Sequence, residues 1–279
     1  MINVLKLWFS SIATTFANFG ALLIFAIIYA FLLVASYLFI SLREATIGQV
    51  LVTYALVILI PLIFFILQAS IIDRVVLEKL RWRVILLDAL KFIVVSIPVL
   101  LVAWLVYYLL NKLALRYPPP AVELQAVPPA AAPAKPLPLH WPSLFFTTVR
   151  FVLFGVAFPL ALIHLWIAVA GGALLKDGVK AFLKRIASSL ARAFSSDSVL
   201  IYGLGLLIFF VLPYVILVPT FTINGNKREF AVFVLRLVLS YLLSLVGWVL
   251  TLTALARNVA GLPVEVSAPV MAQPTESTA

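Results

Sequence analysis

The segment Tyr117–Pro142, YPPPAVELQAVPPAAAPAKPLPLHWP, separates two long apolar regions of the chain. It contains nine of the 17 prolines. Proline has no backbone N–H and its ring blocks a helix interior, so this composition predicts an extended, polyproline-like linker. The linker divides the chain into two membrane regions, 1–116 and 143–256. They are followed by a tail, 257–279, that we expect to be disordered because it holds three prolines and no long apolar run.

The composition is that of a membrane protein. Of the 279 residues, 65% are hydrophobic and only 11% are charged, whereas soluble domains are about 45–50% apolar and about 25% charged. A soluble globule of this size could not bury so much apolar surface. The chain has no cysteine, which excludes disulfides, thiolate metal sites and cysteine nucleophiles.

Six apolar segments are long enough to cross a bilayer as helices, since about 20 helical residues span a hydrocarbon core of about 30 Å. We therefore predict an all-α, polytopic membrane protein with about six transmembrane helices plus cytoplasmic amphipathic elbow helices. An interfacial helix over residues 1–16 is expected to precede the first span. The predicted spans are roughly 17–40, 50–70, 92–110, 144–165, 199–219 and 230–256.

Two charged segments between the spans are predicted to form the elbows. Residues 71–91 carry Asp73, Arg74 and Glu78 among other charges, and each charge costs roughly 3 kcal/mol to insert, so the chain should leave the bilayer there. Residues 176–196 have the pattern of an amphipathic helix on the membrane surface. Its apolar stripe consists of Val179, Leu183, Ile186, Leu190 and Phe194.

The cations of these elbows are candidates for contact with anionic lipid headgroups. They are Arg81, Arg83, Lys180, Lys184, Arg185 and Arg192. The alternative is a solvated face that carries only the positive charge usual on the cytoplasmic side. The net charge of +10 suits a lipid surface better than nucleic acid, because no water-soluble domain presents a basic face.

Counting lysine and arginine predicts the orientation. Twelve of the 20 lysine and arginine residues fall on the side of the membrane that holds both termini and both elbows, and eight fall on the side of the linker. We therefore expect a multi-pass protein of the inner or plasma membrane with both termini cytoplasmic and the linker outside.

A search for catalytic chemistry is negative. The chain has no H-E-x-x-H, no G-x-S-x-G and no Walker lysine loop, and its two histidines, His140 and His164, are far apart in sequence. We predict no catalytic, metal or cofactor site, and hence no enzyme. No aspartate or glutamate is predicted deep in a span, which argues against ion-coupled transport because such transporters usually need one.

Four intramembrane polar residues are candidates for a function. His164 is either a substrate or proton contact or a neutral histidine bonded to a neighbouring helix. Arg236 either contacts an anion or extends to the outer interface. Ser240 and Ser244 continue the face of Arg236.

The face that begins at Arg236 and Ser240 continues to Gly247 and Thr251 in the last span. This face is either a helix-packing seam or the lining of a polar cavity. We predict that it points into the bundle. The residues expected to lie nearer lipid are Phe233, Leu235, Leu242 and Val249.

Two short motifs accompany the six-span pattern: DALK at 88–91 and KDGVK at 176–180. With prolines inside the spans, the chain resembles the YciC-like bacterial membrane proteins and the membrane domain fused to some glycerophosphodiester phosphodiesterases. The resemblance covers most of the chain and implies an inner-membrane location. The absence of a soluble phosphodiesterase domain and the long linker depart from it, and no functional residue carries over.

Three functional hypotheses follow from the sequence, and the least favoured, a membrane-embedded enzyme, has no catalytic motif to support it. The first is a non-enzymatic membrane protein that organises lipids or partner proteins, based on the amphipathic elbows and the absence of catalytic groups. The second is a permease or transport component for a small or lipidic substrate, based on the proline-containing spans and on His164 and Arg236. The expected partner in either case is the bilayer, with anionic headgroups at the cytoplasmic face; the sequence names no protein partner.

Overall fold

The computed structural model describes residues 2–43, 45–78, 80–118, 140–170, 172, 178–218 and 226–261. Within these residues the chain is helical and contains no strand. Most of the linker and of the tail, residues 119–139 and 262–279, lies outside the described residues. The α-helices are α1 (Ile2–Ala17), α2 (Phe19–Ser41), α3 (Ile47–Val76), α4 (Trp82–Ala114), α5 (Trp141–Arg150), α6 (Phe158–Val169), α7 (Gly178–Ala193), α8 (Ser196–Leu206), α9 (Leu212–Leu217) and α10 (Asn226–Ala260).

Two π-helical turns join shorter helices into continuous spans. The turn η1 (Phe151–Ala157) connects α5 to α6, and η2 (Leu207–Val211) connects α8 to α9. With α2, α3, α4 and α10, the described part of the chain has six helical segments long and apolar enough to cross a membrane, as in a multi-pass integral membrane protein. The prediction of an all-α, six-span protein is confirmed.

The chain turns differently at the two predicted elbows. The second elbow contains a helix of its own, α7. At the first, α3 continues to Val76 and α4 begins at Trp82, and the described residues between them, 77–78 and 80–81, form no separate helix. Glu78 adopts a φ of 57° there. The helices extend further than predicted because Asp73 and Asp88 are buried within the protein and do not require an exit to water.

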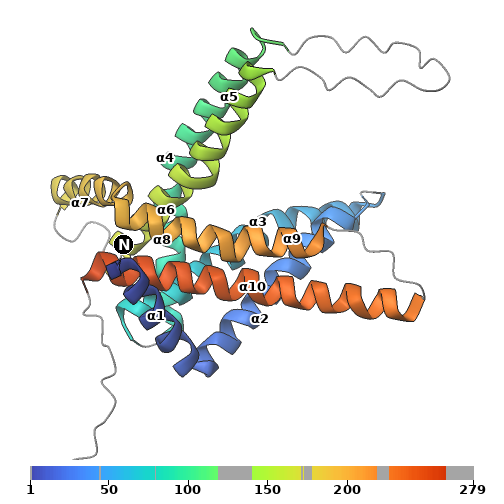
Figure 1. The fold of residues 1–279 in the computed structure, drawn as a ribbon, viewed down its shortest axis with the longest axis horizontal. Helices are drawn as coiled ribbons and strands as arrows, with labels where there is room; N and C mark the ends of the chain where they lie inside the picture. Colours follow the sequence, from blue (N-terminus) through green and yellow to red (C-terminus); the bar gives the residue numbers. More distant parts are fainter. Residues whose placement is uncertain are drawn as a thin grey trace, which may run out of the picture.

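The helices form a bundle with a projecting arm (Figure 1). The bundle consists of α2, α3, the first half of α4, α6, α8, α9 and α10, while the second half of α4 and its neighbour α5 leave it as a two-helix arm. α1, α7 and the end of α10 lie at one end of the bundle, and the end of α9 and the start of α10 lie at the other. We call the end that holds α1, α7 and the end of α10 the basic end, because the cations of α7 and the turn between α3 and α4 with Arg81 lie there.

About two turns of α10, near its C-terminal end, form the centre of the core. Every residue from Val249 to Ala256 is buried, because α1, α3, α6 and α8 all pack against this helix. Val249 is only 1% exposed, so its predicted place near lipid is wrong. Phe233, Leu235 and Leu242, nearer the start of the helix, are exposed as expected.

Two prolines inside the spans are accommodated by hydroxyl groups of neighbouring helices. Pro159 cannot donate to the carbonyl of Gly155, four residues earlier, and the Tyr202 hydroxyl donates to that carbonyl at 3.0 Å. In the same way, the Ser244 hydroxyl donates at 3.1 Å to the carbonyl of Phe209, four residues before Pro213. Each proline follows a π-helical turn, and these bonds supply the freed carbonyls with partners that lipid lacks.

Candidate functional site

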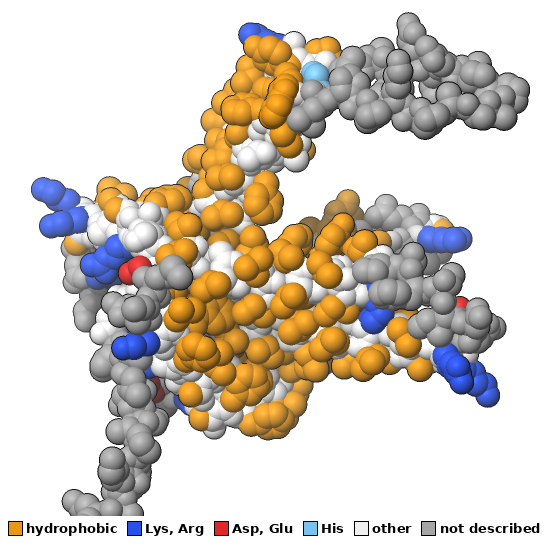
Figure 2. Space-filling view, in the orientation of Figure 1, with side chains coloured by type: hydrophobic (Ala, Val, Ile, Leu, Met, Phe, Trp, Pro, Cys, Tyr) orange, Lys and Arg blue, Asp and Glu red, His pale blue; other side chains and the backbone are white. Residues whose placement is uncertain are grey.

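The predicted headgroup cations lie on the surface at the basic end. All six are exposed: Arg81, Arg83, Lys180, Lys184, Arg185 and Arg192. The last four belong to α7, and Figure 2 shows lysine and arginine side chains gathered over that helix while apolar side chains cover most of the bundle flank. These side chains lie at the end of the spans, where the headgroups of a bilayer would lie.

The apolar stripe of α7 faces outward only in part. Val179, Leu183 and Phe194 are 62%, 58% and 57% exposed, while Ile186 and Leu190 are half-buried against the bundle. α7 therefore presents exposed apolar side chains next to exposed cations. This is the arrangement of a helix that lies in a membrane interface.

α7 is attached to the bundle through small residues. Ser189 donates a hydrogen bond from its hydroxyl to the carbonyl of His164 at 2.7 Å, and Ala193 is fully buried. The following helix α8 is capped by Ser195, whose hydroxyl accepts from the Ser198 N–H. The attachment fixes which face of α7 remains outside.

His164 is completely buried, and both of its ring nitrogens have partners. Nδ1 lies 2.9 Å from the carbonyl oxygen of Leu160, and Nε2 lies 3.1 Å from the Ser198 hydroxyl. These contacts join α6 to α8. They favour the interpretation of His164 as a hydrogen-bonded link between helices over that of a substrate contact.

Arg236 binds the end of α9. Its Nε donates to the Ile216 carbonyl at 2.6 Å and its Nη2 donates to the Leu217 carbonyl at 3.0 Å. These carbonyls belong to the last turn of α9, where intrahelical donors run out and the helix dipole is negative. Arg236 therefore caps the C-terminal end of α9.

The polar face below Arg236 packs against the same span. The Ser240 hydroxyl lies 3.5 Å from the Pro213 carbonyl, and Ser244 bonds Phe209 as described above. A Cβ placed on Gly247 would lie 2.8 Å from the backbone nitrogen of Phe209. The face is therefore a close helix-packing seam, which leaves no room for a polar cavity at these positions.

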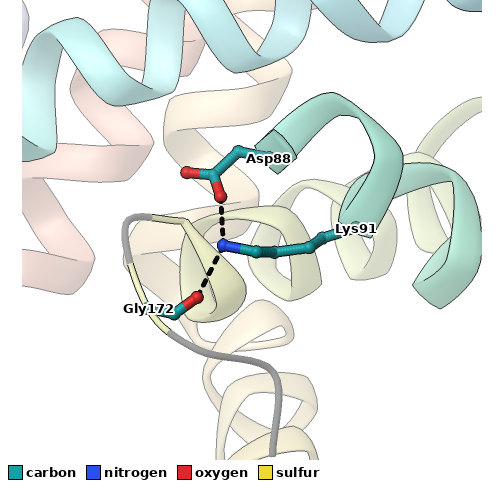
Figure 3. Close-up of polar contacts among 3 residues, drawn as sticks. All are labelled: Asp88, Lys91 and Gly172. Carbon is teal, nitrogen blue, oxygen red and sulfur yellow. Dashed lines mark hydrogen bonds and ion pairs between the residues drawn. The ribbon is translucent and has the colours of Figure 1, made fainter. Parts of the chain in front are cut away.

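The structure reveals a charged cluster that the sequence analysis missed. Asp73 on α3 and Asp88 on α4 are 1% and 0% exposed, and Lys91 lies one turn after Asp88. The Lys91 ammonium group contacts the Asp88 carboxylate and donates to the Gly172 carbonyl at 2.6 Å (Figure 3). Lys91 thereby ties α4 to the segment between α6 and α7.

Asp73 is the unusual member of this cluster. Its carboxylate is buried beside the carboxylate of Asp88, and Lys91 is its other charged neighbour. The sequence analysis did not predict that these acids, near the end of α3 and the start of α4, would be buried in the protein. The available signal was the spacing: Asp73 and Asp88 flank a short turn, which brings antiparallel helices face to face.

Among the described residues, no group of three or more histidine, cysteine, aspartate or glutamate side chains could hold a metal ion. Comparisons of the chain with protein-family models, with curated proteins and with solved structures found no match.

Proposed function

We propose that this multi-pass membrane protein is non-enzymatic and binds anionic lipid headgroups through its basic end, as part of membrane organisation. One observation carries the proposal: α7 exposes Val179 and Leu183 beside Lys180 and Lys184. Each cation near an anionic surface contributes about 1 kcal/mol. The apolar side chains would enter the acyl boundary while the longer lysine side chains reach the headgroups.

The proposal includes an orientation in the inner or plasma membrane, with both termini cytoplasmic. Its support is the uneven distribution of lysine and arginine and the resemblance to YciC-like proteins. Because the chain has no cysteine, single cysteines report accessibility cleanly. We expect an impermeant thiol reagent applied to intact cells to label Arg43→Cys and to spare Lys6→Cys, two exposed positions. The opposite pattern would reverse the orientation.

The lipid contact is tested by hydrogen exchange of α7 in nanodiscs. We expect its amides to exchange more slowly in anionic than in zwitterionic bilayers, and the difference to disappear in Lys180→Gln/Lys184→Gln. The matched control is Lys227→Gln/Arg228→Gln, which removes two exposed cations at the start of α10. Equal exchange of α7 in both bilayers would refute the electrostatic contact.

Transport is a second candidate function, favoured by the buried carboxylate of Asp73 beside that of Asp88. Intramembrane acids often mark ion or substrate pathways. A cysteine at Asp73 distinguishes the two functions. Labelling by small thiol reagents from both sides of the membrane would support a pathway, and protection from both sides would support a closed bundle.

A further inference from the structure

A cavity of about 440 Å³ lies at the basic end, away from α7. It is bounded by the junction of α1 with α2, the end of α3 and the end of α10. Its volume falls within the range of small-molecule sites in proteins. The helix ends that surround it place it at the depth of an interface, where headgroups meet acyl chains.

Two arginines stand in the wall of this cavity. Arg74 donates to the side-chain oxygen of Asn18 and to the carbonyl of Glu78, and Arg257 donates to the Thr14 hydroxyl at 2.9 Å. These bonds hold guanidinium groups from α3 and α10 against the cavity, although the residues are 183 positions apart in sequence. A guanidinium presents five donors in a planar fork that matches a phosphate.

The charged and apolar residues that line the cavity fit an anionic amphiphile. The ionisable groups are Arg74, Arg257 and Glu78, two cations against one carboxylate. Neutral polar residues of α1, α10 and the α1–α2 junction also line it, and apolar residues of α2, α3 and α10, among them Leu22 and Phe25, form the rest of the wall. A ligand that satisfies both parts needs a phosphate at one end and a hydrocarbon chain at the other.

The surroundings of the cavity indicate where such a ligand would come from. Phe9 and Phe16 of α1 are 70% and 51% exposed, and Phe19 at the start of α2 is 69% exposed. An apolar surface therefore continues outward from the α1–α2 junction. In a protein with six apolar spans, lipid covers such a surface.

We propose that this cavity holds the phosphate group of one anionic phospholipid from the bilayer, bound by Arg74 and Arg257, with an acyl chain along Leu22 and Phe25. The proposal deepens the proposed function, since both place anionic lipid at the basic end. It adds a defined site with one lipid per chain, whereas α7 would contact the surface collectively.

The test is native mass spectrometry of the delipidated protein titrated with phosphatidylglycerol. We expect one tightly held lipid, with affinity at least about tenfold lower in Arg74→Gln/Arg257→Gln, since hydrogen bonds to charged groups are among the strong ones. The matched control, Lys227→Gln/Arg228→Gln, removes two exposed cations at the start of α10, away from the cavity, and should bind normally. An equal loss in both pairs would show a general charge effect and overturn the site.

Two further titrations establish the source and class of the ligand. Phosphatidylcholine should bind at least about tenfold more weakly, because its ammonium group cancels the charge that the arginines attract. Soluble glycerol 3-phosphate should not displace the bound lipid, because it lacks the chain. Equal binding of phosphatidylcholine, or displacement by glycerol 3-phosphate, would overturn the proposal.

A variant that keeps both arginines guards against a folding artefact. Ala21 lines the cavity, and Ala21→Trp should fill it, abolish the single tight lipid and leave the unfolding temperature close to that of the wild type. Undiminished binding by Ala21→Trp would overturn the site. Lys180→Gln/Lys184→Gln should retain the tight lipid, so failure of the α7 contact and failure of this site give different results.

Discussion

The hairpin of α4 with α5, η1 and α6 has two ends that both carry large apolar side chains but bury them to different extents. Near the bundle, Phe92 and Leu160 are fully buried. In the arm, Leu101 and Phe145 on the same two segments are 62% and 61% exposed (Figure 1). Hydrophobicity alone therefore does not decide which residues this protein buries, because lipid is as apolar as a leucine side chain.

The hydrogen bonds and aromatic contacts of the hairpin differ between its bundle end and its arm end. Near the bundle, the Trp166 indole N–H donates to the Ser96 hydroxyl at 2.9 Å, and Phe92 stacks on the Trp166 ring. In the arm, Arg150 donates to the Asn111 side-chain oxygen at 2.7 Å. The bundle end gains packing from helices on several sides, whereas the arm has two helices and an otherwise open surface.

The largest expected difference comes from truncating a core aromatic residue. Phe92→Ala should destabilise the protein by about 3–5 kcal/mol, because the neighbouring helices cannot fill the resulting cavity. The arm variant Leu101→Ala should change stability by less than about 0.5 kcal/mol, because lipid or detergent refills the space. Unfolding in detergent measures both. Equal losses would show that the arm is packed as tightly as the bundle.

Adding volume at the helix seam tests the same comparison from the opposite direction. Gly247→Leu should cost about 1–3 kcal/mol, because its Cβ would already lie 2.8 Å from a methyl group of Ile208 and from the Phe209 backbone nitrogen. Gly203→Leu on α8 is the control, since no atom lies within 4 Å of a Cβ there. If Gly247→Leu unfolded at the wild-type temperature in detergent, the close packing of α10 on η2 would be refuted.

A smaller effect is expected from removing one hydroxyl group in the bundle. Tyr202→Phe should cost about 0.6 kcal/mol, a typical value for a hydrogen bond between helices in a membrane, because the Gly155 carbonyl loses its donor. Tyr107→Phe in the arm removes a hydroxyl from a half-exposed ring that packs on Phe154. Denaturant titration should show no change for this arm variant, and a larger loss there than in Tyr202→Phe would contradict the assignment.

The smallest effect should come from the outer face of α10. Leu242→Ala, at a position 46% exposed, should change stability by less than about 0.5 kcal/mol. Val249→Ala, two turns further along the same helix, should cost more, because Val249 is buried. A loss in Leu242→Ala that exceeded the loss in Val249→Ala would restore the earlier assignment of Val249 to the lipid-facing side.

Some local features followed from the sequence because they depend on neighbours along the chain. The helix α7 and the ends of most spans are of this kind. Proline spacing likewise indicated which carbonyls would lose a donor, but not that Tyr202 and Ser244 would replace it. Those two hydroxyls come from other helices, and their places follow only from the packing.

The candidate sites were predicted less completely. The exposed cations of α7 were found because charge and apolar residues alternate with helical spacing. The buried pair Asp73 and Asp88 and the cavity arginines Arg74 and Arg257 were not. Asp73 and Arg74 are adjacent in the sequence, yet one is buried against α4 while the other lines a cavity. Adjacent positions on a helix face different neighbours. Hydropathy treats both charged residues alike, because it does not depend on those neighbours.

The sequence by itself determined that this is an all-α protein with six spans and charged connections, since placing a charge in hydrocarbon costs roughly 3 kcal/mol and so limits where a span can run. The tertiary structure alone decided which apolar faces are buried and which charges are enclosed. Lipid and protein interior are similarly apolar, so the choice between them depends on close packing and hydrogen bonds between helices distant in sequence.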